Sequence, residues 1–581
     1  MSALRLHKFK ARFVRGIFAS IAPLLLLQYL AFLPVTAEVP TVNYVFPAGG
    51  KQGSTVEITV GGKLDPWPLS VCGDSPGLTF KTNEAKGKFT LEISTNAPIG
   101  PHLIRFYNAE GASATRCFVV GHLDEQLEKE PNDSPDKAQA LEKLPIVLNG
   151  RLDKTDDSDS FAVRLEKGQW LVAWVDAYSL DSPVDPILQL RDRAGTKVAF
   201  NHDDRSLDPL LAYQAKETGM FVLQLAGFAY PPRAEVRLTG GEGAVYRLTV
   251  SSGPVARYAF PPRVVRGSKT SVRLFGWNLG QTGEALACEI DASAVNKHAI
   301  DFFPALPALE NRPRIRIGAL PEQLEIEPNN TTDLAQPLPC PAAISGRIDP
   351  PGDEDRFALT AKKGDKFLFR LESAQFGFPL DGVLRITDQS GKELSRSDDA
   401  GRSADPELHW TAPADGTFVI AVSDLIQRGG SDFVYHLEIN EPKPSFNAVV
   451  EGNAFRLEPG KSVEVKATVS RLHGFAANLL VVADGLPDGV TSTTATVSSK
   501  GEATLKLSAT DDAKPANQPF RVLAIAPDLD PPAIRTAAAN LKGQNTAAGD
   551  LLINQTEKLW VTVLPAKPKT EDKPADQPKK E

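Results

Sequence analysis

The feature that most constrains this chain is a long internal repeat. The segment Leu127-Glu-Lys-Glu-Pro-Asn-Asp-Ser134 matches Leu324-Glu-Ile-Glu-Pro-Asn-Asn-Thr331, 197 residues later. Further matches follow at nearly the same offset: Gly150–Asp153 with Gly346–Asp349, Asp157–Ala162 with Asp353–Ala358, and Gly219–Val222 with Gly416–Val419. Solenoid repeats have only about 20–50 residues, so a period this long indicates duplicated domains.

The repeat extends upstream, where Tyr44-Val-Phe-Pro47 matches Tyr258-Ala-Phe-Pro261. A unit of one small and one larger module therefore occurs twice. The predicted boundaries are 38–122 and 254–320 for the small modules, 123–253 and 321–442 for the larger ones, and 443–564 for a fifth module without an internal copy. The tail 565–581 has no apolar residue beyond Ala and Pro, which predicts disorder.

The local patterns predict strands throughout. Val56-Glu-Ile-Thr-Val60 and Val463–Val469 alternate apolar and polar residues, and Trp170–Val175 is aromatic and β-branched. With 46 Pro and 44 Gly to form turns, we expect an all-β chain of tandem β-sandwiches, immunoglobulin-like and jelly-roll-like, arranged as beads in a rod. A short helix is expected after each Glu-Pro-Asn element, beginning at Ser134-Pro135 in the first copy.

The N-terminus, residues 1–37, has the organisation of a secretory signal peptide. Basic residues from Arg5 to Arg15 precede the apolar stretch 16–33, and Val35-Thr-Ala37 supplies small residues for cleavage. A retained membrane anchor is the alternative, and no later apolar run is long enough to span a membrane. We expect a secreted, periplasmic or cell-surface protein.

Charge and cysteine content narrow the function further. Without the first 37 residues, 59 basic residues face 72 acidic ones, a net charge of −13 that argues against nucleic-acid binding. Export makes disulfides plausible, and Cys72 and Cys117, which fall in one module, are the predicted pair. Buried free thiols are the alternative, and whether Cys288 and Cys340 pair is left open.

The repeated motifs support a family resemblance. Glu-x-Glu-Pro-Asn, Gly-Arg-Leu/Ile-Asp, Asp-x-Asp-x-Phe, Lys-Gly and Gly-x-Phe-Val occur in both larger modules, which resemble the bacterial pre-peptidase C-terminal (PPC) domain. This β-sandwich occurs beside secreted proteases and in many exported proteins without one. The small modules resemble the IPT/TIG immunoglobulin-like fold, and the whole layout resembles exported multidomain proteins of planctomycete-type bacteria.

Each Glu-Pro-Asn element concentrates acidic side chains. Glu128, Glu130 and Asn132 are spaced by two, which places them on one face of an extended chain, and Asp133 follows at the bend. Carboxylate and amide oxygens without His or Cys suit calcium. The predicted ligands are Glu128, Glu130, Asn132, Asp133, Asp157 and Asp159 in the first copy, and Glu325, Glu327, Asn329, Asn330, Asp353 and Asp355 in the second.

The resemblance adds that some PPC domains bind calcium with this element. Because Asn330 replaces the acid Asp133, we expect weaker binding in the second copy. The alternative is structural: Asn132 or Asp133 caps the following helix, and the glutamates are solvated.

No catalytic motif is present. The sequence lacks His-Glu-x-x-His, Gly-x-Ser-x-Gly and a P-loop, and its eight histidines are scattered. We therefore expect a non-catalytic exported binding, adhesion or envelope protein, stabilised by calcium, whose partner is a surface polysaccharide, a matrix protein or another exported protein. The alternative is a secreted hydrolase or a targeting subunit that accompanies a protease.

Overall fold

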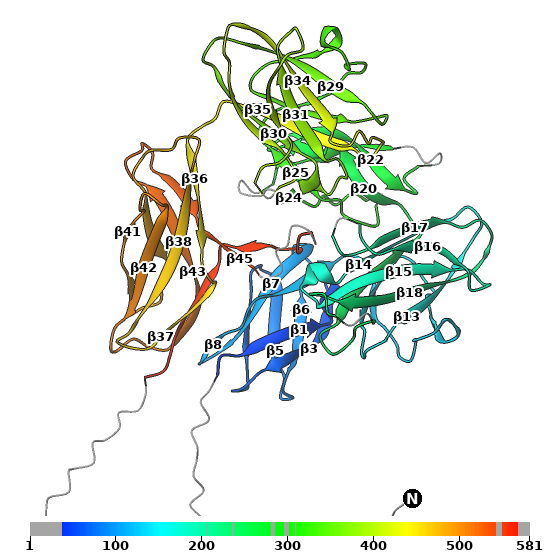
Figure 1. Ribbon diagram of the computed structural model, residues 1–581. Helices are drawn as coiled ribbons and strands as arrows, with labels where there is room; N and C mark the ends of the chain where they lie inside the picture. The colour runs from blue at the N-terminus through cyan, green and yellow to red at the C-terminus, as the bar shows by residue number, and fades with distance from the viewer. Residues whose placement is uncertain are drawn as a thin grey trace, which may run out of the picture. The chain divides into compact units, whose positions relative to one another are not determined.

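The computed structural model describes residues 38–204, 206–234, 237–280, 285–295, 301–307, 309–401, 403–541 and 549–566. The predicted signal peptide and the tail from residue 567 lie outside these ranges. Within them, the regular elements are strands and four 3-10 turns (Figure 1), and no helix is long and apolar enough to cross a membrane. The prediction of an all-β chain of tandem sandwiches is confirmed.

The first sandwich consists of strands β1 to β9, and its core takes alternate residues from both sheets, such as Phe89 and Leu91 from one and Phe106 and Phe118 from the other. Its sheets are ordered β1-β3-β6-β5 and β2-β9-β7-β4, with β8 beside β7. The strands are β1 (Thr41–Phe46), β2 (Gly49–Lys51), β3 (Thr55–Lys63), β4 (Ser70–Gly73), β5 (Leu78–Thr82), β6 (Lys88–Ile93), β7 (Gly100–Asn108), β8 (Gly111–Ala112) and β9 (Arg116–Gly121).

The second sandwich consists of two five-stranded sheets, β10-β12-β19-β14-β17 and β11-β13-β18-β15-β16. Phe161, Leu171 and Leu248 are fully buried between them. The elements are β10 (Glu125–Leu127), η1 (Pro135–Lys137), β11 (Gln139–Ala140), β12 (Ile146–Arg151), β13 (Asp159–Leu165), β14 (Trp170–Asp176), η2 (Tyr178–Leu180), β15 (Val184–Arg191), β16 (Lys197–Asn201), β17 (Leu210–Gln214), β18 (Gly219–Ala229) and β19 (Val245–Ser251).

The fourth sandwich repeats the second strand for strand, in the orders β26-β28-β35-β30-β33 and β27-β29-β34-β31-β32. Phe357, Phe369 and Leu437 fill its core. The elements are β26 (Glu322–Leu324), η3 (Thr332–Leu334), β27 (Gln336–Leu338), β28 (Ala342–Arg347), β29 (Glu354–Ala361), β30 (Lys366–Glu372), η4 (Ala374–Phe376), β31 (Gly382–Thr387), β32 (Glu393–Ser397), β33 (Glu407–Thr411), β34 (Gly416–Asp424) and β35 (Val434–Asn440).

The helices expected after the Glu-Pro-Asn elements are the single turns η1 and η3. A buried aspartate organises each of the other two turns. Asp208 accepts three backbone N–H bonds of 2.8–3.1 Å from the start of η2, and Asp405 accepts three of 2.8–2.9 Å at η4. This role explains why the Asp-Pro step at 208–209 recurs at 405–406.

The third sandwich is smaller, with three-stranded sheets ordered β20-β22-β23 and β21-β25-β24 among its described residues. Leu274 and Ile315 are fully buried in its core. The strands are β20 (Val255–Phe260), β21 (Arg263–Val265), β22 (Lys269–Trp277), β23 (Leu286–Asp291), β24 (Asp301–Phe302) and β25 (Ile315–Gly318).

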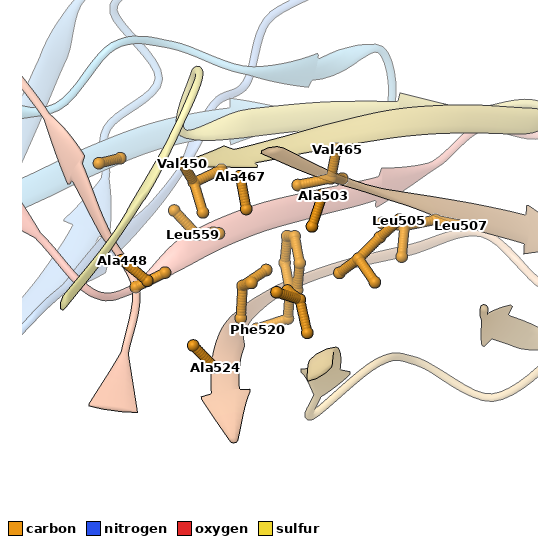
Figure 2. Packing of buried hydrophobic residues seen from close by; sticks show 14 of the residues in the cluster. Ala448, Val450, Val465, Ala467, Ala503, Leu505, Leu507, Phe520, Ala524 and Leu559 are labelled. Carbon is orange, nitrogen blue, oxygen red and sulfur yellow. The ribbon is translucent and has the colours of Figure 1, made fainter. Parts of the chain in front are cut away.

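The fifth sandwich has sheets ordered β40-β42-β38-β36-β45-β46 and β37-β47-β43-β39-β41, with β44 beside β43. Figure 2 shows Val465 and Leu505 of one sheet facing a core shared with Phe520 and Leu559 of the other. The strands are β36 (Ser445–Val450), β37 (Ala454–Leu457), β38 (Ser462–Leu472), β39 (Leu480–Asp484), β40 (Val490–Ser492), β41 (Ala495–Thr496), β42 (Glu502–Ala509), β43 (Ala516–Ala526), β44 (Ala533–Thr536), β45 (Ala538–Asn540), β46 (Gln555–Thr556) and β47 (Leu559–Val563).

The predicted disulfide between Cys72 and Cys117 is wrong. Cys72 lies on β4 and Cys117 on β9, and β7 pairs with both, so one strand separates the two cysteines. Strands lie about 4.8 Å apart, which puts the two Cα atoms roughly 10 Å from each other, beyond the ~7 Å limit for a disulfide. Both thiols are free, as are those of Cys288 and Cys340.

Candidate metal centre

The Glu-Pro-Asn element of the second sandwich connects its two sheets. It continues from β10, which pairs in parallel with β12. The Glu128 N–H donates to the Asn149 carbonyl of β12 at 3.1 Å, and the Asn132 carbonyl accepts from the Ser160 N–H of β13 at 3.0 Å. The element is therefore fixed at both ends by backbone bonds to the sandwich that it enters, and its side chains are held beside the loop between β12 and β13.

Glu128 points to a buried tyrosine. One of its carboxylate oxygens accepts the Arg151 N–H at 2.6 Å, and the other lies 2.6 Å from the Tyr246 hydroxyl, which is also 2.7 Å from Asp159 Oδ2. A phenol has one proton and can donate to only one of these two carboxyl groups. Burial, and then the charge of Glu128, raise the pKa of Asp159, so a second proton is held between the two acids at neutral pH.

Three acids gather beyond this tyrosine. Glu130, Asp133 and Asp157 each place a carboxylate oxygen within 4.8 Å of the others. Glu130 accepts the Asn132 N–H at 2.9 Å, and the buried Asp157 accepts the Asp153 N–H at 2.6 Å. Burial and the nearby charges of Asp157 and Asp133 raise the pKa of Glu130, which shows that the three carboxylates repel one another.

Several buried oxygens at this cluster find no hydrogen-bond partner among the described residues. They are Oδ1 of Asn132, Asp133, Asp157 and Asp159, and the Asn132 amide nitrogen is unpartnered as well. Asn132, Asp157 and Asp159 are fully buried. Buried polar atoms in folded proteins are almost always paired, so a group of unpaired oxygens in one place is the arrangement expected around a bound cation.

The fourth sandwich reproduces the contacts around the buried tyrosine, but its group of three acids contains Asp355, the match of Asp159, in place of a match to Asp133. Glu325 accepts the Arg347 N–H at 2.7 Å, and the Tyr435 hydroxyl lies 3.2 Å from Glu325 and 2.6 Å from Asp355. One oxygen each of Glu327, Asp353 and Asp355 lies within 4.8 Å of the others. Both amide atoms of the fully buried Asn329, and Oδ1 of Asp355, again have no partner in the described part of the chain.

The two copies differ at two matched positions beside the acids, Asp133/Asn330 and Lys154/Pro350. In the first, the Lys154 ammonium lies 2.9 Å from Asp133 Oδ2 and 3.7 Å from Asp157 Oδ1. In the second, Pro350 occupies the place of Lys154, and Asn330, which replaces Asp133, donates its amide to Asp353 at 2.5 Å. The additional carboxylate of the first copy is therefore accompanied by an additional positive charge.

The predicted ligands thus fall into two groups. Glu130, Asp133 and Asp157 meet directly, whereas Glu128 and Asp159 meet through Tyr246. Sequence reasoning missed the tyrosines and Lys154. The tyrosines left a signal, because Val-Tyr occurs at 245–246 and at 434–435, where the last strand of each copy begins. Lys154 directly follows the repeated Gly-Arg-Leu-Asp segment.

Comparison with known proteins gives limited matches. No family model matches the sequence. A probable subtilase-type serine protease of Deinococcus radiodurans is 28% identical over 212 residues, a match that covers 34% of this chain. It spans 22% of the length of that protease.

Solved structures also match, each at low sequence identity and low TM-score. They include a tetra-tandem repeat from the extending region of a large adhesion protein (11% identity, TM-score 0.13, 84% of this chain and 94% of that one). The N-terminal eight Ig domains of Down Syndrome Cell Adhesion Molecule match with 11% identity and TM-score 0.12, over 87% and 63%. The M60 catalytic domain of Clostridium perfringens ZmpB with its CBM51 domains matches with 9% identity and TM-score 0.14, over 69% and 46%.

Proposed function

We propose that this chain is an exported, non-catalytic binding or adhesion protein in which calcium fixes the segment that enters each larger module. The modules proposed are IPT/TIG-like at 38–122 and 254–320, PPC-like at 123–253 and 321–442, and immunoglobulin-like at 443–564. The observation that carries the calcium proposal is the group of buried, unpartnered oxygens that recurs in the second and fourth sandwiches.

The donor set fits calcium better than other biological metals. Every candidate ligand offers a carboxylate or amide oxygen, and calcium accepts six to eight such donors. Zinc and copper prefer nitrogen or sulfur ligands, which the set lacks. Glu130 and Asp133 belong to the entering segment, and Asp157 belongs to the sandwich itself. A shared cation would therefore remove their mutual repulsion and fix the segment to the sandwich.

Calcium would be available to an exported protein. Extracellular calcium modules commonly have dissociation constants near 10⁻⁴–10⁻³ M, so even a weak site fills at about millimolar calcium. We propose Glu128, Glu130, Asn132, Asp133, Asp157 and Asp159 as ligands in the first copy, with the six matched residues from Glu325 to Asp355 in the second.

The proposed partners follow from location and charge. A signal peptide directs the chain to the periplasm, the cell surface or the medium. There it would bind a surface polysaccharide, a matrix protein or another exported protein. A chain with a net charge of −13 after signal removal would not select nucleic acid.

A second candidate function is that of a secreted hydrolase, or of a targeting or accessory subunit that accompanies a secreted protease. The partial match to a probable subtilase-type protease supports it, because 212 residues align with part of that protease at 28% identity. The lack of a known catalytic sequence motif favours the accessory subunit over the hydrolase.

A capture experiment tests the proposed function. Full-length exported protein, immobilised without its signal peptide, is incubated with envelope fractions and purified surface polysaccharide in calcium or in chelator. We expect retention of an envelope component in calcium and reduced retention by the variant Glu130→Ala/Asp133→Ala. Cleavage of a protein substrate by the purified chain, or selective capture of a protease, would reject the first candidate in favour of the second.

A further inference from the structure

A histidine is buried among acids where the fourth sandwich begins. His436 on β35 is 1% exposed, and its Nδ1 lies 3.0 Å from Glu322 Oε1 on β26, the strand that enters this sandwich. Its Nε2 lies 3.9 Å from Glu438 on its own strand and has no hydrogen-bond partner in the described chain. The hydrogen bond from His436 therefore reaches across β28 to hold β26 against the sheet.

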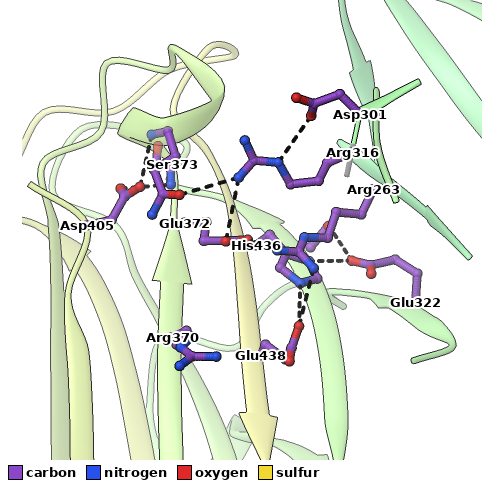
Figure 3. Close-up of polar contacts among 12 residues, drawn as sticks. Arg263, Asp301, Arg316, Glu322, Arg370, Glu372, Ser373, Asp405, His436 and Glu438 are labelled. Carbon is purple, nitrogen blue, oxygen red and sulfur yellow. Dashed lines mark hydrogen bonds and ion pairs between the residues drawn. The ribbon is translucent and has the colours of Figure 1, made fainter. Parts of the chain in front are cut away.

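Charged groups from the third and fourth sandwiches lie around His436. On β30, Glu372 is paired in register with His436, and on β28 the Ser345 hydroxyl donates to Glu322. From the third sandwich, Arg263 of β21 contacts both Glu372 and, at 3.3 Å, Glu438 (Figure 3). Arg316 of β25 lies 3.7 Å from Glu372 and 3.4 Å from Asp301 of β24 (Figure 3).

This cluster is balanced only when the histidine is charged. Four acids, Glu322, Glu372, Glu438 and Asp301, contact His436 and three arginines, of which Arg314 lies 2.7 Å from Asp301. With His436 protonated, four positive charges face the four acids, and with His436 neutral, only three do. Loss of the proton leaves Glu322, whose side chain is 6% exposed, without a positively charged partner.

The first copy uses an arginine at the same place. Arg247 of β19 precedes Leu248 as His436 precedes Leu437, and it binds Glu125 of β10 through two bonds of 2.8 and 2.9 Å. Its guanidinium also reaches β2 of the first sandwich, where a Cβ on Gly49 would lie 1.9 Å from Nη1. Only glycine leaves room for it there.

The two interfaces therefore differ by two linked substitutions, one in the small sandwich and one in the larger sandwich. Gly49 begins β2, and Arg263 begins the matching strand β21, 214 residues later, the offset of the small modules. The first copy combines Gly49 with Arg247, whereas the second combines Arg263 with His436. The guanidinium has moved from the larger sandwich to the smaller one, and a titratable imidazole has taken its former place.

We propose that β26 is held to the fourth sandwich by a proton on His436, so that this interface loosens as the pH rises, whereas the matching Arg247–Glu125 contact of the second sandwich has no imidazole to titrate. The device would give one half of the duplicated chain a response to acidity that the matching contact of the other half lacks.

The direction of this pH dependence follows from the linkage between proton binding and folding. Burial by itself lowers the pKa of His436, but the hydrogen bond to Glu322 and the nearby carboxylate of Glu438 raise it, and the net change is upward from 6.5. A raised pKa in the folded state stabilises below about pH 6.5, and this stabilisation is lost as the pH rises through the folded-state pKa.

Hydrogen exchange of the full-length protein tests this proposal in chelator, where calcium has no influence. The protection factors of β26 and β10 amides, corrected for the intrinsic pH dependence of exchange, are compared between pH 6 and pH 9. We expect protection of β26 to fall severalfold further than that of β10, because the buried acid pairs Glu128–Asp159 and Glu325–Asp355 titrate alike in the two sandwiches and only the fourth has His436. A parallel response of the two strands in the wild-type protein would overturn the proposal.

Two variants sharpen the test. His436→Gln removes the charge and should show weak β26 protection at every pH. Arg263→Gly/His436→Arg copies the first interface and should reduce the pH dependence of β26 to that of β10. Persistence of the wild-type pH profile in either variant would assign the effect to another group and overturn the proposal. The wild-type comparison of β26 with β10 decides the question by itself if either variant does not fold.

Discussion

Replacement of Asp159 by Asn separates two roles of the buried pair Glu128–Asp159: the structural hydrogen bonds of the pair and its proposed role as a calcium ligand. Asn has nearly the shape of a protonated aspartic acid, and its carbonyl can accept the Tyr246 hydroxyl that now lies 2.7 Å from Asp159. Its amide can donate toward Glu128, as the shared proton does. The substitution therefore preserves the structure without a cation but removes a carboxylate that we propose as a calcium ligand.

The expected change in the free energy of unfolding in chelator follows from the pKa of Asp159. Burial, with the charge of Glu128, raises this pKa from 3.8 to about 10, so the folded protein takes up a proton at pH 7. Protonating an aspartate of pKa 3.8 at pH 7 costs roughly 4 kcal/mol. Asp159→Asn removes this cost, and after allowance for imperfect hydrogen bonding we expect a gain of about 2–4 kcal/mol in chelator. By the same linkage, the wild-type sandwich without calcium should lose stability as the pH rises from about 4 to 10.

In calcium, the wild-type protein should be more stable than the Asp159→Asn variant, the reverse of the order in chelator. A cation that binds only the folded state adds about 2.7 kcal/mol at a hundredfold excess over its dissociation constant, and the variant should lack most of this increment. The assay is hydrogen exchange of β13 amides, which reports the local free energy of opening. Asp208→Asn is the matched control, because Asp208 accepts backbone bonds at η2 and is not among the proposed ligands, so its loss should destabilise equally in calcium and chelator. Destabilisation by Asp159→Asn in chelator would refute the reasoning.

Further predictions concern the same cluster and the thiols. Glu130→Ala/Asp133→Ala should lower calcium affinity and the Tm in calcium while hardly changing the Tm in chelator, and calorimetry with melting curves checks this. Lys154→Gln should strengthen calcium binding by the first copy, because the ammonium that contacts Asp133 competes with the cation, and an unchanged affinity in titration calorimetry would contradict this competition. Cys72 and Cys117 should both be alkylated in denaturant without reductant, and mass spectrometry that finds either of them blocked would contradict their free state.

The fold could be predicted from sequence because its signals are local and repeated. Alternation such as Val56-Glu-Ile-Thr-Val60 reports burial directly, and it became β3 with Ile58 and Val60 buried. The duplicated motifs identified matched positions in two sandwiches that share one strand order. The disulfide could not be predicted in this way, because pairing depends on which strand lies between two others, and β7 lies between those of Cys72 and Cys117.

The sequence identified the acids of the site, but it did not show which of them contact one another. Spacing by two suggested that Glu128 and Glu130 act together, yet Glu128 turns to Tyr246, whereas Glu130 joins Asp157. Tyr246 lies 118 residues from Glu128. No local pattern reveals such a contact, which arises only when the last strand, β19, pairs beside β12. The exchange of Arg247 for His436 was hidden for the same reason.

The measurement that tests the central claim most directly is calcium titration of the full-length exported protein by isothermal calorimetry. We expect two sites per chain with affinities in the millimolar range or tighter, of which one is lost in Glu130→Ala/Asp133→Ala and the other in Glu327→Ala/Asp353→Ala. Absence of calcium binding at millimolar concentration, or binding that both variants retain in full, would contradict the claim.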